Sequence, residues 1–374
     1  MSVNAAWNVV NFRAGLVRAL IADGHEVIAA VGDDGAVAGI EALGARVVRL
    51  SMDSAGISPF ADLRLFAHYR ALFRHEQPDV YLGWTIKPNI YGSIAAAFAG
   101  VPAINNISGL GTAFLGAGWL MRVVGILYRI GLRRSATVFF QNAADRELFV
   151  MRGLVREIQT ALLPGSGIDG VAFDPEHYDR TTDGVFRFLL VARLIRDKGV
   201  FEFVEAARML RVTHPAVRFQ ILGFLDVANR TAIDRLTLDG WVAEGLIDYL
   251  GVADDVRPFL AQADCVVLPS YREGTSRVLL EAAAMARPAI ATDVPGCRDV
   301  VRDRETGLLC RSRDAGDLAR AMHEMLAGSE SARVEMGAAA RRDVLARFAE
   351  HKVITSYRAA IADALRGKVT SASH

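Results

Sequence analysis

The sequence lacks a net charge of either sign. Its 374 residues include 43 lysines and arginines and 42 aspartates and glutamates, which gives a formal net charge of +1 at pH 7. This balance excludes a strongly basic nucleic-acid-binding protein and a protein with an acidic tail. Hydrophobic residues make up 52% of the chain and charged residues 23%, so a disordered protein is excluded and large buried cores are expected.

Cysteine is scarce, and its three copies all lie in the second half of the chain. The sequence has no CxxC motif and no cysteine at a metal-ligand spacing from a histidine. This odd and sparse set (Cys265, Cys297 and Cys310) is typical of reduced thiols in a cytoplasmic protein rather than of a disulfide framework.

Long apolar runs are absent as well. The first 20 residues have neither a cationic start nor a sustained apolar stretch, so no signal peptide is expected. The longest apolar candidate, Ala113–Leu132, is interrupted by Arg122 and Arg129. A charge near the centre of a membrane span is costly, so we expect no transmembrane helix.

Acidic residues are missing from one long internal stretch. The 65 residues from Val80 to Ala144 contain no aspartate or glutamate. The cations of this stretch are Lys87, Arg122, Arg129, Arg133 and Arg134. The near-neutral total therefore conceals a region that is locally cationic and apolar.

Short β-rich runs alternate with helical periodicity, which predicts parallel sheets with crossover helices. Strands are expected at 26–31, 45–50, 80–82, 103–105, 137–140 and 160–163, and then at 186–191, 217–222, 247–250, 265–268 and 289–292. Helices are expected at 12–23, 62–75, 90–99 and 145–152, and then at 199–214, 229–244, 256–261, 276–286, 314–327 and about 351–366. The polar tail 367–374 is expected to be frayed.

The repeated series predicts an α/β protein of two doubly wound, Rossmann-like domains. The first comprises residues 1–168 and is joined by the C-terminal helix 351–366, the second comprises residues 169–350, and a hinge lies near 164–172. Ligands of such sheets bind at the carboxyl ends of the strands, so a cleft between the domains is the expected site.

The first domain begins unusually abruptly, because only Met1-Ser2-Val3 precede the polar Asn4. Two explanations stay open: the first strand is very short, or the chain starts several residues too late. Contacts from the following glycine loop are in doubt either way, so Gly15 receives no role.

Three glycine clusters invite a dinucleotide-binding interpretation. Residues 165–170 satisfy GxGxxG, but Pro164 and Pro175 flank them, so no long helix begins there. The clusters 109–111 and 116–118 lack a third glycine. We interpret all three as turn and hinge glycines, which disfavours a nicotinamide-dependent dehydrogenase.

The most informative segment reads LPSYREGTSRVLLEA, a buried strand followed by a polar turn and a helix that begins near Ser276. Glu273 is expected in the turn, where a carboxylate accepts hydrogen bonds from a polyol. Gly274 permits close approach, and the N–H groups of Thr275 and Ser276 lie at a helix end that attracts phosphate. Glu281 lies about 12 Å further along the helix, a separation that suits a ribose. The alternative is an ordinary capping carboxylate followed by a surface one.

A second cationic site follows another predicted strand. Arg193 and Lys198 flank the loop in LLVARLIRDKG, at the carboxyl end of a strand. Two cations that face a helix N-terminus favour the binding of a diphosphate. The alternative is a pair of solvated loop charges.

With these patterns the sequence resembles the retaining glycosyltransferases of family 4, which have the GT-B fold. The resemblance rests on Arg193-x4-Lys198-Gly199, on Glu273-x7-Glu281 and on Gly296 in DVPG, and it covers nearly the whole chain. Segments 7–13, 87–92, 108–111 and 163–169 are similar to those of bacterial members that extend lipid-linked surface oligosaccharides.

The resemblance implies roles for individual residues. Arg193 and Lys198 would bind the donor diphosphate and neutralise the departing nucleoside diphosphate, and Glu273 would hold hydroxyls of the donor sugar. The other implied donor contacts are Gly223 in the donor cleft, Gly251 and Val252 beside the base, Gly274, Thr275 and Ser276 through their backbones, and Glu281 at the ribose. The acceptor or membrane side would involve Lys87, Gly109, Gly111, Arg122, Arg129, Arg133 and Arg134. Many members also carry a cleft histidine, but this chain reads NNIS at 105–108, so no histidine receives a role.

No DxD-type metal motif ends a predicted strand. The acid pairs 33–34 and 254–255 lie in sequences typical of turns and are interpreted as solvated. We therefore expect a metal-independent reaction in which cations and helix dipoles replace the ion. The resemblance implies attack on the face from which the leaving group departs, with the leaving phosphate helping to deprotonate the acceptor.

Residues 118–134 predict an apolar, aromatic and basic helix without acids. Such a helix would lie at an anionic membrane leaflet and meet a polyprenyl diphosphate. The alternative is an internal helix whose arginines reach the surface, and both stay open.

Together these features predict a cytoplasmic, peripherally membrane-associated, retaining glycosyltransferase. It would transfer a sugar from a nucleotide donor, with a UDP-HexNAc favoured, to a lipid-linked saccharide in surface glycan assembly. Two alternatives remain: a GT-B nucleotide-sugar epimerase, and a non-catalytic assembly component that binds nucleotide-sugar.

Overall fold

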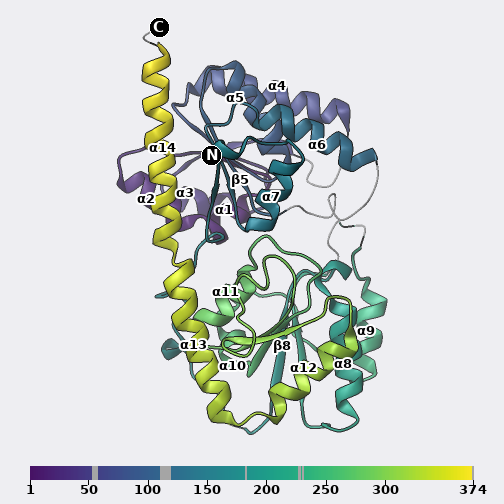
Figure 1. Ribbon diagram of the computed structural model, residues 1–374. Coiled ribbons are helices and arrows are strands. Elements are labelled where there is room, and N and C mark those ends of the chain that lie inside the picture. The colour runs from purple at the N-terminus through teal and green to yellow at the C-terminus, as the bar shows by residue number, and fades with distance from the viewer. Residues whose placement is uncertain (53–57, 110–118, 182, 226–228, 230, 373–374) are drawn as a thin grey trace. The chain divides into compact units, whose positions relative to one another are not determined.

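A computed structural model describes residues 1–52, 58–109, 119–181, 183–225, 229 and 231–372, and the chain divides into two compact units (Figure 1). The N-terminal unit comprises Met1–Gly167 and Glu350–His374, and the C-terminal unit comprises Ile168–Ala349. Each contains one parallel β-sheet with helices packed on it, so the predicted pair of Rossmann-like domains is confirmed. No helix within these described ranges is both long and apolar enough to cross a membrane.

The N-terminal sheet has seven strands in the order β3-β2-β1-β4-β5-β6-β7. The chain starts in the middle of the sheet and adds strands outward on each side, which is the Rossmann arrangement. Its strands are β1 (Ser2–Val3), β2 (Ile28–Val31), β3 (Arg46–Arg49), β4 (Tyr81–Trp84), β5 (Ala103–Ile107), β6 (Thr137–Phe140) and β7 (Thr160–Leu162). Strand β1 comprises two residues and pairs with both β2 and β4, an arrangement that agrees with either of the two expected explanations.

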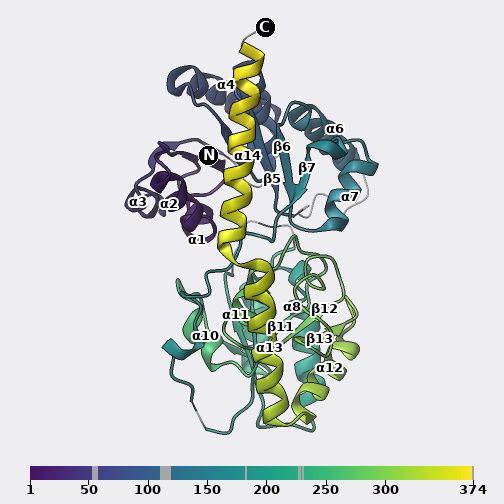
Figure 2. The same ribbon diagram turned by 60° about the vertical axis from the view of Figure 1, so that its left-hand side comes forward.

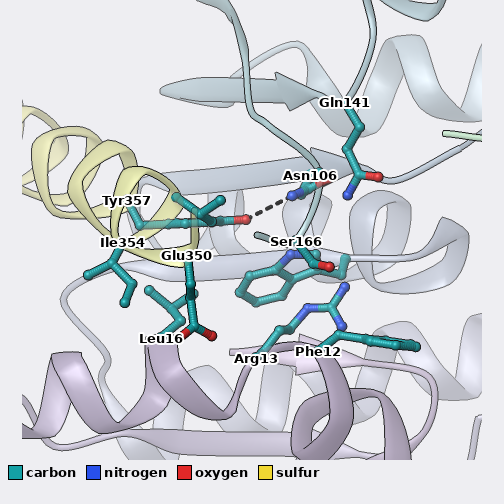
Figure 3. A pocket seen from close by; sticks show the side chains of 12 residues that line it. Phe12, Arg13, Leu16, Asn106, Gln141, Ser166, Glu350, Ile354 and Tyr357 are labelled. Carbon is teal, nitrogen blue, oxygen red and sulfur yellow. Dashed lines mark hydrogen bonds between the residues drawn. The ribbon is translucent and has the colours of Figure 1, made fainter. Parts of the chain in front are cut away.

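Helices cover both faces of this sheet (Figures 1 and 2). One group packs with the cluster that contains Val3 and Tyr357: α1 (Ala6–Phe12), α2 (Ala14–Ala22), α3 (Val37–Ala42) and α14 (Glu350–Ala372). The others are α4 (Pro59–Glu76), the π-helix η1 (Pro88–Gly92), α5 (Ser93–Phe98), α6 (Trp119–Leu132) and α7 (Ala143–Met151). Helix α14 is anchored by Tyr357, whose hydroxyl accepts a 3.0 Å hydrogen bond from the side chain of Asn106 on β5 (Figure 3).

The C-terminal sheet has six strands in the order β10-β9-β8-β11-β12-β13. They are β8 (Arg187–Val191), β9 (Arg218–Leu222), β10 (Asp248–Tyr249), β11 (Cys265–Leu268), β12 (Ala289–Thr292) and β13 (Gly307–Cys310). Its helices are α8 (Val200–Arg211), α9 (Arg235–Ala243), α10 (Arg257–Gln262), α11 (Arg277–Ala284), α12 (Ala315–Ala327) and α13 (Glu330–Phe348). Strands such as β8 and β11 are buried on both faces, which explains their continuous apolar sequence.

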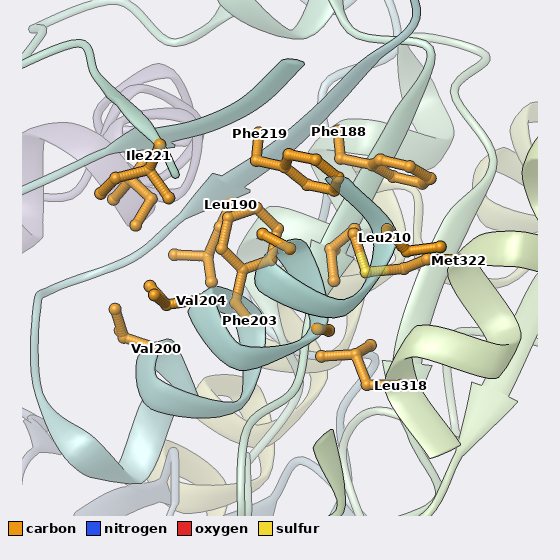
Figure 4. Packing of buried hydrophobic residues seen from close by; sticks show 14 of the residues in the cluster. Phe188, Leu190, Val200, Phe203, Val204, Leu210, Phe219, Ile221, Leu318 and Met322 are labelled. Atoms are coloured by element: carbon orange, nitrogen blue, oxygen red, sulfur yellow. The ribbon is translucent and has the colours of Figure 1, made fainter. Parts of the chain in front are cut away.

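The largest core of the C-terminal unit lies between its sheet and helices α8 and α12 (Figure 4). Phe203 of α8 is fully buried there, and its ring packs edge-on against Phe219 of β9 at a centroid distance of 6.3 Å. Leu318 and Met322 of α12 close the same cluster. This core holds the carboxyl ends of the strands in register and so positions the loops that follow them.

Several elements differ from the sequence-based expectation. The expected helix 12–23 is two helices that meet at Arg13, and β13, α3 and α13 were not predicted. Helix α13 buries mainly small residues such as Gly337 and Ala340, so its apolar periodicity is weak. The tail expected to fray is helical as far as Ala372, because one glycine, Gly367, lowers helix stability by only about 1 kcal/mol and does not end a helix.

The core of α8 gives a test of this packing. Phe203→Ala should lower the free energy of unfolding by about 3–5 kcal/mol because the cavity does not refill. Met209→Ala on the same helix is the matched control, since Met209 is 51% exposed and should change stability by less than about 0.5 kcal/mol. Urea unfolding of the full chain measures both, and equal losses would contradict the assigned inner face of α8.

Candidate functional site

Four loops meet at the carboxyl edge of the C-terminal sheet, and glycines allow the contact. A Cβ atom on Gly199 would collide with the carbonyl oxygen of Pro269, and one on Gly223 would collide with that of Ala192. A Cβ on Gly296 would collide with the backbone of Glu273. All three glycines have positive φ, which favours glycine further. The loops after β8, β9, β11 and β12 therefore touch through their backbones.

Lys198 and Glu273 form an ion pair at this edge. Their side chains are only 21% and 13% exposed, and the backbone N–H of Tyr271 donates a 2.9 Å hydrogen bond to the carbonyl of Asp197, which joins the two loops. Arg193 lies on the same loop, is exposed, and its side chain has no hydrogen bond or ion pair with the described residues. The structure thus brings Lys198 and Glu273 into contact and places Arg193 on the loop that carries Lys198.

The turn before α11 is fixed by the β12 loop. Glu273 donates its N–H to Pro295 O at 3.2 Å, and Ser276 donates its N–H to Gly296 O at 3.2 Å. The Ser276 hydroxyl caps the helix by accepting from Leu279 N at 3.4 Å. The N–H of Ser276, which was expected to face phosphate, is therefore already engaged within the protein.

Glu281 is on the buried side of α11. It is 8% exposed and accepts a 2.7 Å hydrogen bond from Nε of Arg277, one helical turn before it. Burial raises the pKa of the Glu281 carboxyl, and the neighbouring Arg277 opposes that rise. A carboxylate held in this way is oriented by the arginine.

The predicted base-binding loop lies beside Gly223. Gly223 donates its N–H to Gly251 O at 2.8 Å, and its carbonyl accepts a 2.9 Å hydrogen bond from the Tyr249 hydroxyl. Val252 follows with its side chain half-exposed at 51%. The structure therefore places Gly251 and Val252 on a loop beside Gly223, and their roles at the base and in the donor cleft stay predictions.

The predicted acceptor residues of the N-terminal unit that the structure describes lie on different elements. Lys87 is in an ion pair with Asp62 at 2.9 Å, and Asp62 also accepts a 3.0 Å hydrogen bond from Tyr91. Gly109 lies two residues after the end of β5, and Gly111 lies outside the described residues. Lys87 thus has a structural partner, which an interaction with an acceptor would have to share or replace.

Helix α6 carries the predicted arginines on its exposed face. Val124, Tyr128 and Leu132 face inward and are buried, and Gly131 lies against the backbone of Ile90 in η1. The exposed face and the turn after it combine Arg122, Val123, Ile126, Arg129, Ile130, Arg133 and Arg134. Ile126 and Ile130 are 59% and 54% exposed, so apolar side chains and arginines alternate on one surface. We call these seven residues the α6 surface.

The sequence patterns did not identify several residues that the structure places at or near these sites. Arg277 precedes Glu281 by four positions, a spacing at which helical side chains pair, so it could have been found. No sequence pattern indicates a role for Tyr249. Thr85, directly after β4, has φ of 61° and a buried hydroxyl without a hydrogen-bond partner in the described structure. Such backbone strain in a β-branched residue concentrates at functional sites and is invisible in a sequence.

The residues at the carboxyl edge of the C-terminal sheet are suited to bind a ligand that carries both negative charge and hydroxyl groups. Arg193 and Lys198 supply positive charge, and Glu273 and Glu281 supply carboxylate acceptors. In the described ranges, no group of three or more His, Cys, Asp or Glu side chains could hold a metal ion.

Comparisons with known proteins agree with this geometry. Residues 9–165 match the family described as "Glycosyl transferase 4-like domain", and residues 185–328 match "Glycosyl transferases group 1". The N,N'-diacetylbacillosaminyl-diphospho-undecaprenol alpha-1,3-N-acetylgalactosaminyltransferase of Campylobacter jejuni is 26% identical over 91% of this chain and 92% of its own length. The capsular polysaccharide biosynthesis glycosyltransferase CapM of Staphylococcus aureus is 24% identical over 81% of each chain.

Solved glycosyltransferases share the fold. A glycosyltransferase from Rickettsia africae superposes with a TM-score of 0.77 at 16% identity, over 98% of this chain and 97% of that one. Alr3699/HepE of Anabaena, in complex with UDP and glucose, has a TM-score of 0.75 at 18% identity, over 96% of this chain and 98% of that one. The two family matches span most of both units. The chain therefore belongs to the family 4 glycosyltransferases of GT-B fold and is an enzyme of the glycosyltransferase class.

Proposed function

We propose that this enzyme transfers an N-acetylhexosamine, with retention of configuration, from a UDP-sugar to a polyprenyl-diphosphate-linked saccharide in surface glycan assembly. The Campylobacter relative, by its name, transfers N-acetylgalactosamine to a sugar on diphospho-undecaprenol, and it matches this chain over nearly its full length. The name of CapM places that relative in capsular polysaccharide biosynthesis, and the HepE structure contains UDP. These relatives support the acceptor class, the sugar and the nucleotide.

The Lys198–Glu273 ion pair at the carboxyl edge of the C-terminal sheet carries the proposal. A nucleotide-sugar carries a diphosphate next to a ring of hydroxyls, so it offers one partner to each member of the pair. Lys198 then faces the diphosphate together with Arg193, and Glu273 accepts hydrogen bonds from the donor sugar. Glu281, oriented by Arg277, accepts from the ribose, while Gly251 and Val252 border the base.

Charge development during transfer explains the cations. As the bond between the anomeric carbon and the diphosphate oxygen breaks, that oxygen gains negative charge, which Lys198 and Arg193 stabilise. The acceptor hydroxyl attacks from the same face, its proton passes to the departing diphosphate, and the new bond to the anomeric carbon forms with retention. Two cations fill the role that a metal ion plays elsewhere, so we propose that no metal ion is required.

The α6 surface supports a peripheral position at the cytoplasmic face of the membrane. Its arginines would lie at anionic headgroups while Val123, Ile126 and Ile130 enter the interface. Helix α6 contains no acidic residue, so nothing on it opposes that contact. Such a position would present the enzyme to a lipid-linked acceptor.

The proposed reaction is tested by incubating the enzyme with UDP- and GDP-sugars, with and without polyprenyl-diphosphate-linked saccharide, and measuring nucleoside diphosphate release. We expect release from a UDP-HexNAc that depends on acceptor and persists in EDTA. Conversion of the donor without acceptor would instead indicate an epimerase. Donor binding without any turnover would indicate a non-catalytic component, and loss of release in EDTA would overturn metal independence.

Replacement of Glu273 tests the proposed role of the Lys198–Glu273 ion pair. Glu273→Gln keeps the side-chain shape but loses the charge that accepts from the sugar, so kcat/KM should fall about 10- to 150-fold while UDP still binds. Glu244→Gln is the matched control, because Glu244 is also paired with a cation, Arg208, but at the surface and with no assigned role in the site. Steady-state kinetics and calorimetric titration with UDP measure the effects, and unchanged kcat/KM in Glu273→Gln would remove its assigned role.

Charge reversal tests the membrane surface. The double variant Arg133→Glu and Arg134→Glu should lower the binding constant for phosphatidylglycerol vesicles by about 30-fold, since each cation near the surface contributes roughly 1 kcal/mol of binding free energy. Co-sedimentation with the vesicles measures this constant. The matched control is Arg18→Glu with Arg342→Glu, which makes the same charge change at exposed arginines outside α6. Equal sedimentation of both double variants and the wild-type protein would contradict the proposal.

A further inference from the structure

A pocket opens in the N-terminal unit at the carboxyl edge of its sheet (Figure 3). Its enclosed part has room for about one water-sized group, and the rest of its space belongs to the open mouth. Arg13 enters it from the junction of α1 and α2, Asn106 from the end of β5 and Tyr357 from α14, as Figure 3 shows. Trp84, the register partner of Asn106 on β4, forms part of the wall.

Arg13 is a buried cation without an acidic partner among the described residues. It is 8% exposed, its guanidinium lies 4.9 Å above the Trp84 ring, and Nη1 donates a 2.8 Å hydrogen bond to Asn8 O. Its Nε–H is buried and has no acceptor within the described structure. Burial lowers the pKa of Arg13 to about 10, so the group is still charged at neutral pH. A buried donor left without a partner is costly, which points to an acceptor supplied from outside.

Asn106 has a buried hydrogen-bond acceptor that is unsatisfied. Its side-chain nitrogen donates to Tyr357, but its side-chain oxygen is buried without a donor among the described residues, and the residue is 3% exposed. The pocket thus holds one unsatisfied donor, on Arg13, and one unsatisfied acceptor, on Asn106. A ligand group that satisfies both must itself accept and donate a hydrogen bond.

The charge of the pocket narrows the ligand further. Arg13 and Glu350 are the basic and the acidic residue in its lining, so the lining has no net charge to select an anion. A phosphate would satisfy Arg13 but would place a second acceptor against Asn106. Hydroxyl and acetamido groups each contain both a donor and an acceptor, and the half-buried Phe12 side chain adds an apolar surface to the wall.

The neighbouring Asn105 has hydrogen-bond partners for its side chain within the protein, in contrast to Asn106. Asn105 points to the opposite face of β5, where Nδ2 donates to Asn89 and Ser93 at 2.9 and 2.7 Å and Oδ1 accepts from Ser135 at 2.7 Å. Its side-chain hydrogen bonds are satisfied within the protein, whereas those of Asn106 are not. Two adjacent buried asparagines therefore differ in this one respect.

We propose that the Arg13–Asn106 pocket is a saccharide subsite that receives a hydroxyl or acetamido group of one of the sugar substrates. The proposal rests on the proposed transferase function and adds a specificity-determining site in the N-terminal unit. Donor and acceptor both carry such groups, and the experiment below distinguishes them.

Three variants test the subsite: Asn106→Leu, Arg13→Met and, as the matched control, Asn105→Leu. We expect Asn106→Leu and Arg13→Met to raise the KM for one substrate, donor or acceptor, by about tenfold or more and to leave the other KM unchanged. Which KM rises identifies the source of the group. Asn105→Leu should instead shift the unfolding midpoint, because it strands the partners of three hydrogen bonds, and should leave both KM values near wild type.

A binding measurement separates this proposal from the transferase function. Saturation-transfer NMR with the methyl α-glycosides of N-acetylgalactosamine and galactose needs no turnover, and comparison of the two tells acetamido from hydroxyl recognition. Glycoside binding that survives Glu273→Gln but is lost in Arg13→Met supports the subsite even if the wild-type protein shows no transfer. Folded Asn106→Leu and Arg13→Met proteins with both KM values and glycoside binding within twofold of wild type would overturn it.

Discussion

Close backbone contact at the carboxyl edge of the C-terminal sheet is the constraint on which the site depends. Gly199, Gly223 and Gly296 each lie where a Cβ would overlap a neighbouring loop. Because the loops touch at these points, side chains separated by 75 positions, Lys198 and Glu273, form an ion pair. A larger residue at any of the three glycines would separate the loops before it altered a charged group.

In the N-terminal unit, the alternation of side chains along one strand separates a face whose hydrogen bonds are satisfied from a face that lines a pocket. Along β5, Asn105 turns to a face where the protein satisfies its hydrogen bonds, and Asn106 turns to a face where it does not. Gly83 on β4 is the register partner of Asn105, and the space left by its missing side chain admits the Asn105 amide. One face of the strand thereby fixes helix packing, and the other opens on the pocket.

The fold was largely predictable because its strands are continuous apolar runs and its longer helices are amphipathic. Elements that depend on small residues or on very few positions, such as β13 and α13, were not predicted, since tertiary packing rather than local pattern defines them. At the site, the strand-end positions of Lys198 and Glu273 were readable from breaker and turn residues. The ion pair of Lys87 with Asp62, the strain at Thr85 and the unsatisfied groups of Arg13 and Asn106 were not, because they arise from contacts between distant segments.

The Lys198–Glu273 ion pair has a consequence for discrimination among cellular metabolites. A ligand that binds Lys198 but offers no hydroxyls to Glu273 leaves a largely buried carboxylate without a partner. A neutral sugar that binds Glu273 leaves the charge of Lys198 without a partner. Free phosphate, inorganic diphosphate and unactivated monosaccharides each compensate only one half of the pair. In the proposed donor site, the pair would therefore favour molecules in which a diphosphate and a sugar are covalently joined over the much larger pool of their separate parts.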